Sequence, residues 1–117
     1  MNLKRLSRLI HSNALKKGFW DNRMAYTDTI IPRSIGDQFA NFHAEISEAW
    51  EEYRNGHAMD EIYFKDDKPE GVPIELADTV IRILDTCAQY GIDIEKAIKV
   101  KMKYNAGRPY RHGGKLA

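Results

Sequence analysis

The sequence predicts an all-α protein, a bundle of four to five helices in one domain spanning residues 1–117. Apolar residues recur at spacings of three and four along four segments, which is the period of an amphipathic helix. Pro, Ser, Asp and Gly stand at the borders of these segments, as they do at helix ends. We find no convincing strand pattern. Because four helices of this length often leave apolar faces uncovered, we expect dimerisation to complete the core.

The first helix is expected over residues 2–17, with Gly18 as the residue that ends it. The segment that follows, residues 19–26, is aromatic and polar without a clear period, so we expect a loop or short turn. Its aromatic side chains, Trp20 among them, either fill the core or line a pocket for a nucleotide base.

The central helix is expected over residues 33–54, beginning near Pro32 and Ser34. At about 100° per residue its side chains form two stripes. The stripes lie roughly 90–120° apart, so the polar one borders the apolar face, where side chains are partly buried and still reach a ligand. The apolar stripe contains Phe39, Phe42, Ile46, Ala49 and Tyr53, and the polar stripe contains Asn41, Glu45, Glu48 and Glu52.

Two more helices are expected after a polar linker at residues 57–72, whose length suggests a functional loop or lid. The third helix, residues 74–90, is apolar over much of its circumference and should be buried centrally. The fourth, residues 94–106, begins with Asp93 as its N-cap. The remaining residues, 108–117, form a basic tail that we expect to be extended.

Composition argues for an ordinary protein of a reducing cytosol. The single cysteine, Cys87, excludes an internal disulfide framework and is expected to be a buried, inert thiol. No signal-peptide core and no membrane-spanning run is present, so we expect a cytoplasmic protein, bacterial or phage-encoded. Residues 38–95 hold 14 acids and 4 Lys or Arg, whereas the chain after Glu95 holds 7 Lys or Arg and no acid. These halves either neutralise each other or form the metal and anion sides of one site.

Two carboxylate pairs carry the chemistry. Glu45 and Glu48 lie three residues apart on one helix, and Glu75 and Asp78 repeat that spacing on another. Such neighbours repel each other unless a cation lies between them. Helices joined by one loop usually pack antiparallel, which can bring the two pairs opposite each other. Oxygen ligands of this kind suit Mg²⁺, with Mn²⁺ as a substitute.

Other interpretations of these acids remain open at this point. A single pair of this spacing is most often solvated surface charge. Glu52 is either an outer ligand or a base that orients water, whereas Glu51 lies off the stripe. A di-iron site needs Glu-x-x-His motifs, which His43 does not supply. The other histidines lack the spacing of zinc ligands.

A basic set on the fourth helix is a candidate phosphate clamp. Lys101, Asn105 and Arg108 are spaced i, i+4 and i+7, so they share a face or nearly so. Fixed positive donors of this kind bind phosphate oxygens, and the alternative is ordinary exposed surface. Nucleic-acid binding by the basic tail is disfavoured, because the tail is short and the net charge is only +1.

The carboxylate spacing and the surrounding residues resemble a known family. Glu45-x-x-Glu48, 26 intervening residues and Glu75-x-x-Asp78 resemble the ExxE…ExxD signature of the all-α nucleoside triphosphate pyrophosphohydrolases, the MazG-like group. The resemblance extends over about residues 10–115. It also includes Lys17-Gly18-Phe19-Trp20, His43-Ala44-Glu45-Ile46-Ser47-Glu48-Ala49, Tyr104-Asn105 and Arg108-Pro109-Tyr110.

The resemblance implies a helical bundle that forms a homodimer or homotetramer. It implies hydrolysis of a nucleoside or deoxynucleoside triphosphate to the monophosphate and pyrophosphate. The four acids would be Mg²⁺ ligands, Lys101 and Asn105 would contact substrate, and Trp20 would stack on the base. Helix geometry adds Arg82 and Arg108 as substrate-binding residues.

The expected mechanism is attack on a phosphorus, with the α-phosphorus favoured, by water that the metal activates. Glu48 is the candidate group for positioning or deprotonating that water. Two alternatives are a catalytically silent nucleotide-binding regulator and a helical protein that associates with nucleic acid. The acidic quartet disfavours the second, since binding DNA does not require it.

Overall fold

The computed structural model describes residues 2–23, 30–32 and 34–109, with only the backbone described at 22–23 and 30–32. Residues 110–117, which form most of the predicted basic tail, and residues 24–26 of the predicted loop lie outside this description, as do residues 27–29 and 33. The described part has four helices and four short strands. In chain order they are α1 (Leu3–Lys16), β1 (Asp21–Arg23), β2 (Ile30–Pro32), α2 (Ile35–Arg54), β3 (Tyr63–Lys65), β4 (Lys68–Glu70), α3 (Val72–Gln89) and α4 (Ile94–Ala106).

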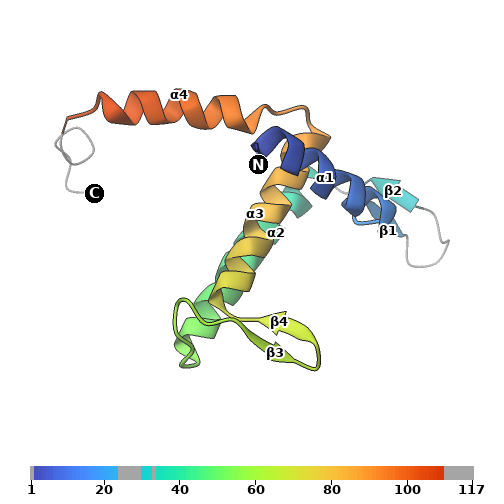
Figure 1. Cartoon of the computed structure of the whole chain (residues 1–117). Coiled ribbons are helices and arrows are strands. Elements are labelled where there is room, and N and C mark those ends of the chain that lie inside the picture. Colours follow the sequence, from blue (N-terminus) through green and yellow to red (C-terminus); the bar gives the residue numbers. More distant parts are fainter. Residues whose placement is uncertain (1, 24–29, 33, 110–117) are drawn as a thin grey trace.

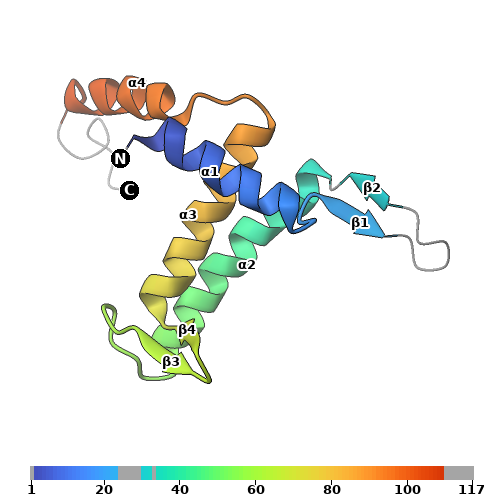
Figure 2. The ribbon, with the colours of Figure 1, turned by 45° about the vertical axis from the view of Figure 1, so that its right-hand side comes forward.

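Helices α2 and α3 form the centre of the molecule. They lie side by side and run in opposite directions, and α1 crosses the C-terminal half of α3 (Figures 1 and 2). Helix α4 turns away and makes its main helix contact with α1. The predicted central position of the third helix is therefore confirmed, because α3 packs against α1, α2 and β4. Its predicted burial holds only in part, because Leu76, Val80 and Ile81 are exposed.

The helix boundaries follow local signals in the sequence. Ser34 accepts a hydrogen bond from the backbone N–H of Asp37, and Asp37 accepts one from the backbone N–H of Ser34, which forms a capping box. Asp93 caps α4 by accepting from the backbone N–H of Lys96 at 3.1 Å, as predicted. Pro73 lies in the first turn of α3, where it removes no intrahelical bond.

The prediction that the chain lacks strands is wrong. Strands β1 and β2 pair in one antiparallel hairpin, and β3 and β4 pair in another. The second hairpin lies within the predicted linker, where Asp66 and Asp67 both have positive φ, at 52° and 67°. Two such residues between two strands are typical of a type I′ turn. Asp-Asp is a weaker hairpin signal than Asn-Gly. The strands beside it have only three residues each, which is too short to show a periodic pattern.

Burial on α2 is opposite to the expected pattern. The apolar stripe does not face α3: Phe39, Ile46 and Tyr53 are exposed. The buried positions are Gln38 and Glu45, which lie on or beside the polar stripe, and Ala49, a small residue of the apolar stripe. Glu45 therefore lies inside the helix pair, whereas Glu48 is exposed and the large apolar side chains Phe39, Ile46 and Tyr53 lie outside it. Because the two stripes lie on different sides of α2, only one of them can face α3, and most of the other faces away from it.

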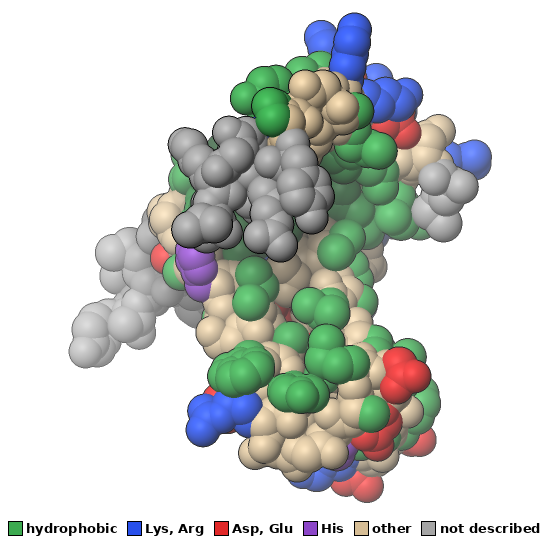
Figure 3. All heavy atoms as spheres, turned by 90° about the vertical axis from the view of Figure 1, so that its left-hand side faces the viewer, with side chains coloured by type: hydrophobic (Ala, Val, Ile, Leu, Met, Phe, Trp, Pro, Cys, Tyr) green, Lys and Arg blue, Asp and Glu red, His purple; other side chains and the backbone are tan. Residues whose placement is uncertain are grey.

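The protomer is open and has a small apolar core. Its radius of gyration is 17.6 Å, whereas a compact domain of this length would have about 13 Å. Large apolar residues remain exposed on every helix, and several hydrophobic side chains are exposed on the face that Figure 3 shows. Such a surface favours association with another protein chain. The apolar residues that are buried are Ala14, Trp20, Ala49, Val72, Leu84 and Cys87.

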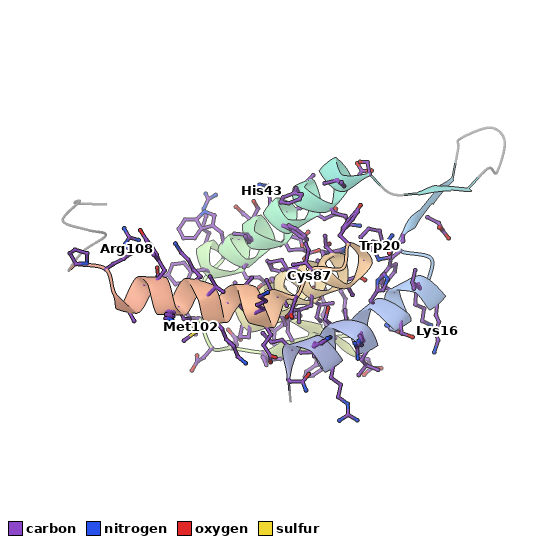
Figure 4. The ribbon with its side chains drawn as sticks, turned by 90° about the horizontal axis from the view of Figure 1, so that it is seen from above. Lys16, Trp20, His43, Cys87, Met102 and Arg108 are labelled. Atoms are coloured by element: carbon purple, nitrogen blue, oxygen red, sulfur yellow. The ribbon has the colours of Figure 1, made fainter. Side chains whose placement is uncertain are left out.

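A buried polar cluster ties α1 to α3. The indole Nε1 of Trp20 donates to both carboxylate oxygens of Asp85, at 3.0 and 2.9 Å, and His11 Nδ1 lies 2.6 Å from Asp85 Oδ1. The Trp20 ring also meets the rings of His11 and Tyr90 edge to face. Cys87 is buried nearby on α3 (Figure 4), and burial raises the pKa of its thiol, in line with the predicted inert cysteine.

None of the helices in the described part of the chain has the length and apolar character that crossing a membrane requires. The longest, α2, contains Glu45, Glu48 and Glu52 along its length.

Candidate metal centre

Helices α2 and α3 bring three of the four predicted metal ligands together. One carboxylate oxygen each from Glu45, Glu48 and Glu75 can be chosen so that all three atoms lie within 4.8 Å of one another. Glu45 and Glu75 are buried, whereas Glu48 is exposed. The predicted antiparallel packing is what places the two acidic segments opposite each other.

Glu75 is the central group of this cluster. Its side chain is only 9 % exposed, and its Oε2 atom has no hydrogen-bond partner among the described residues. Burial raises the pKa of this carboxyl from 4.5 to about 8, with further contributions from a hydrogen bond to Glu48 and the charges of Glu48, Asp78 and Glu45. A buried acceptor without a donor is costly. A divalent cation between these oxygens would remove that penalty, so the residues present fit Mg²⁺ or Mn²⁺.

Asp78 lies one turn further along α3 and is half-buried. Burial raises its pKa, and so does the charge of Glu45, whereas the charge of Arg82 lowers it. The Nε of Arg82 donates to Glu45 Oε1 at 2.8 Å. The predicted substrate-binding arginine therefore lies beside the predicted metal ligands, on the same helix as Asp78.

A second carboxylate group shares Glu75 with the first. Oxygens of Glu52 from α2, Glu70 from β4 and Glu75 lie within 4.8 Å of one another. The Tyr63 hydroxyl donates to both oxygens of Glu52, at 2.8 and 3.1 Å. This hydrogen bond, with burial and nearby acidic charge, raises the pKa of Tyr63 to about 12. The phenol therefore remains a donor at neutral pH.

Sequence reasoning missed Glu70, Tyr63 and His57 as parts of this region. The His57 ring stacks on Tyr63 with centroids 4.4 Å apart, and its Nδ1 lies 3.0 Å from Glu61 Oε1. The residues that were missed, Glu70, Tyr63 and His57, all come from the predicted linker at residues 57–72. Its unusual length was the available signal, and only the hairpin places Glu70 beside Glu75.

A recess of about 550 Å³ begins beside Asp78 and Arg82 and runs between α1 and α3. Its walls are mostly apolar, and Asn13 and Asp85 add polar atoms. Small-molecule sites usually have this size and this mixture. The recess is lined by Leu9, Ile10, Asn13, Ala14, Phe19, Asp78, Ile81, Arg82 and Asp85.

Trp20 lies in the core, which is one of the two roles that the sequence left open. Its ring is buried against His11 and Tyr90, and its Nε1 is bonded to Asp85. The adjacent Phe19 is exposed and lines the recess. Of the two aromatic side chains, Phe19 is therefore the one that a bound base could reach without displacing the core.

The predicted phosphate clamp lies on α4, apart from the carboxylates of the same chain. Lys101 Nζ and the Arg108 guanidinium lie over the Tyr104 ring, 4.8 and 5.6 Å from its centre. Lys101 and Asn105 are exposed. Figure 4 shows Arg108 at the far end of α4, while exposed His43 lies on α2. A second copy of the chain would be needed to bring these donors to the carboxylates.

The raised pKa of Glu75 predicts a pH-dependent stability in the absence of divalent cations. Its folded pKa of about 8 lies above the ordinary 4.5, so folding favours the protonated form. This contribution to the free energy of unfolding is complete below about pH 4.5 and is lost as the pH rises through 8. In the presence of EDTA, we expect the thermal midpoint to decrease as the pH is raised from about 5 to about 9.

Excess Mg²⁺ should reverse that trend, because the cation binds the deprotonated carboxylates. Differential scanning calorimetry across this pH range, with EDTA or with Mg²⁺, measures both effects. Equal pH dependence under the two conditions would contradict the prediction.

Comparison with protein-family models, curated proteins and solved structures gave no match for this chain. The features of this chain that point to a function are therefore its carboxylate geometry and the residues of the sequence signature. Both concern the same acidic side chains, Glu45, Glu48, Glu75 and Asp78.

Proposed function

We propose that this protein is a Mg²⁺-dependent nucleoside triphosphate pyrophosphohydrolase of the MazG-like type, with Mn²⁺ as a possible substitute. It would convert a nucleoside or deoxynucleoside triphosphate and water to the monophosphate and pyrophosphate. The observation that carries the proposal is the convergence of Glu45 and Glu48 on Glu75, whose buried Oε2 has no partner among the described residues. The ExxE…ExxD spacing supports the same conclusion.

Glu45, Glu48, Glu75 and Asp78 would hold the cation. When bound, Mg²⁺ would neutralise phosphate charge and make water more acidic. Arg82 already donates to Glu45, which orients that carboxylate. Arg82 also lines the recess, so its remaining guanidinium donors are available to a phosphate oxygen.

Glu48 is the proposed base, because it is the exposed member of the cluster and reaches solvent water. It would accept a proton from the water that attacks the α-phosphorus. A bond would form between that oxygen and phosphorus, and the bond from the α-phosphorus to the bridging oxygen would break. Pyrophosphate would leave with the electron pair.

The recess beside Asp78 and Arg82 would take the nucleoside. Its volume of about 550 Å³ and its apolar walls suit a base and sugar, and the exposed Phe19 ring is available for stacking. Asn13 and Asp85 would supply polar contacts there. This assignment places the triphosphate towards the carboxylates.

We further propose that the protein works as a homodimer or homotetramer. The exposed apolar stripe on α2 and the small core of the protomer support this. Because α4 extends away from its own carboxylates, Lys101, Asn105 and Arg108 would contact the phosphates of a substrate bound to a neighbouring copy.

The experiment that tests the activity is a screen of common and modified nucleoside triphosphates with Mg²⁺, in which nucleotide and phosphate products are separated. We expect the monophosphate and pyrophosphate in equal amounts. Glu48→Gln and Asp78→Asn should lower turnover at least about 100-fold, because each removes part of the cation site. Glu51→Gln is the matched control, since it removes an equal charge from the exposed side of α2.

Two outcomes would overturn this proposal. Release of only inorganic phosphate would indicate a different bond cleavage. Tight nucleotide binding without turnover of any triphosphate would favour a regulatory protein that binds nucleotides. Circular dichroism of Glu48→Gln and Asp78→Asn separates loss of turnover from loss of folding.

A further inference from the structure

We propose that Glu52, Glu70 and Glu75 hold a second divalent cation, so that Glu75 joins two adjacent cation sites. This inference extends the proposed function, because the first site also uses Glu75. It assigns roles to Glu70 and Glu52 that the ExxE…ExxD signature does not contain.

Three separate elements supply the ligands of this second site. Glu52 comes from the last turns of α2, Glu70 from the end of β4 and Glu75 from the first turn of α3. One oxygen from each lies within 4.8 Å of the other two. Ligands that converge from three elements indicate a folded site rather than a chance row of acids along one helix surface.

The hairpin fixes the position of Glu70. Tyr63 and Glu70 are directly opposite each other across the two strands, so their side chains share one face. The Tyr63 hydroxyl reaches Glu52, and this contact orients that face towards α2. Gly71, with φ of 121°, allows the chain to pass the Glu61 carbonyl, which a Cβ at this position would overlap. The turn into α3 therefore requires glycine.

The unpartnered oxygen of Glu75 indicates a ligand at the point where the two carboxylate groups meet. Glu52 has Tyr63 as a donor and His57 Nε2 at 3.7 Å, and Glu70 has Lys68 Nζ at 3.4 Å. Glu75 is the most buried of these three acids, and its Oε2 has no partner in the described structure. A carboxylate can offer one oxygen to each of two cations, so Glu75 can serve both groups.

The ligand set selects the class of cation. Carboxylate oxygens suit Mg²⁺ and Mn²⁺, and water would complete the coordination. His57 is not one of the residues whose ligand atoms converge here, since the group consists of Glu52, Glu70 and Glu75. The site therefore offers oxygen atoms without the nitrogen and sulfur ligands that zinc prefers.

The test is the number of Mn²⁺ ions that bind per chain, measured on the intact protein by equilibrium dialysis and electron paramagnetic resonance. The wild-type protein should bind two. Glu70→Gln should bind one ion at the first site, and its affinity for Mn²⁺ at the second site should fall at least about 10-fold. Glu48→Gln should also bind one, because it affects the first site only. Glu75→Gln should weaken both sites.

Controls separate a folding defect from a lost ligand. Glu51→Gln removes an equal charge from α2 outside both groups and should still bind two ions. Glu52→Gln provides a second variant of the new site if Glu70→Gln does not fold, as judged by circular dichroism. One ion bound by the wild-type protein and by Glu70→Gln, and none by Glu48→Gln, would overturn the second site and leave the proposed function intact. No binding at all would overturn both.

Discussion

Glu75→Gln should stabilise the protein without divalent cations and at the same time abolish its turnover of nucleoside triphosphates. The stabilisation follows from the raised pKa of this carboxyl, which shows that the folded protein disfavours its charge. A neutral amide removes that charge and can donate to the neighbouring carboxylates. A gain of about 1 kcal/mol would raise the thermal midpoint by roughly 4–8 °C at pH 8.

Turnover should fall at least about 100-fold in this variant, because Glu75 belongs to both carboxylate groups. Calorimetry in EDTA measures the stability, and separation of the nucleotide products measures the turnover. Asp60→Asn, which neutralises an exposed acid in the loop before β3, should change neither. A variant that is less stable than the wild type at pH 8 in EDTA would contradict the prediction.

Higher stability together with lost turnover distinguishes a carboxylate that binds a ligand from one that stabilises the fold. A buried acid that stabilised the fold would have a donor, as Asp85 has in Trp20 and His11. Glu75 has no donor for Oε2 among the described residues, and the charges of the neighbouring acids disfavour its ionised form. An opposed change in stability and activity is the expected sign of a residue retained for binding a ligand.

The helices could be predicted from the sequence because their signals are local. Asp93 caps α4 where the pattern indicated, and the carboxylate pairs were identified from i, i+3 spacing alone. Ser34, predicted to lie in the first turn of the central helix, is instead its N-cap, and Pro32 lies in β2. The meeting of Glu45 and Glu48 with Glu75 could also be predicted, because one connection between two helices favours antiparallel packing.

The remaining features depend on tertiary structure. Strands of three residues are too short to show a period, so the hairpin that places Glu70 beside Glu75 could not be recognised. The orientation of α2 could not be predicted either. Its polar stripe borders the apolar one at roughly 90–120°, and the sequence contains no signal that α3 would contact the polar one. Apolar residues that would normally indicate a core, such as Phe39 and Ile46, are instead on the surface.

That exposed stripe leads to the second large expected effect. Trp50→Glu should convert the proposed oligomer to a monomer. Trp50 is 57 % exposed on α2, stacks on Tyr53 and lies on the same side of the helix as Ile46. A charge buried in an apolar interface without a partner is strongly unfavourable. A penalty of about 3 kcal/mol would raise the dissociation constant roughly 100-fold.

Analytical ultracentrifugation measures this change, and thermal midpoints at several protein concentrations provide a second measurement. An associating wild type should unfold at higher temperatures as its concentration rises, whereas the Trp50→Glu midpoint should not depend on concentration. Met59→Glu places the same charge at an equally exposed apolar residue of the loop before β3 and should leave the oligomer intact. A monomeric wild type would contradict the prediction. It would also leave Lys101 and Asn105 without a substrate to bind, because α4 extends away from the carboxylates of its own chain.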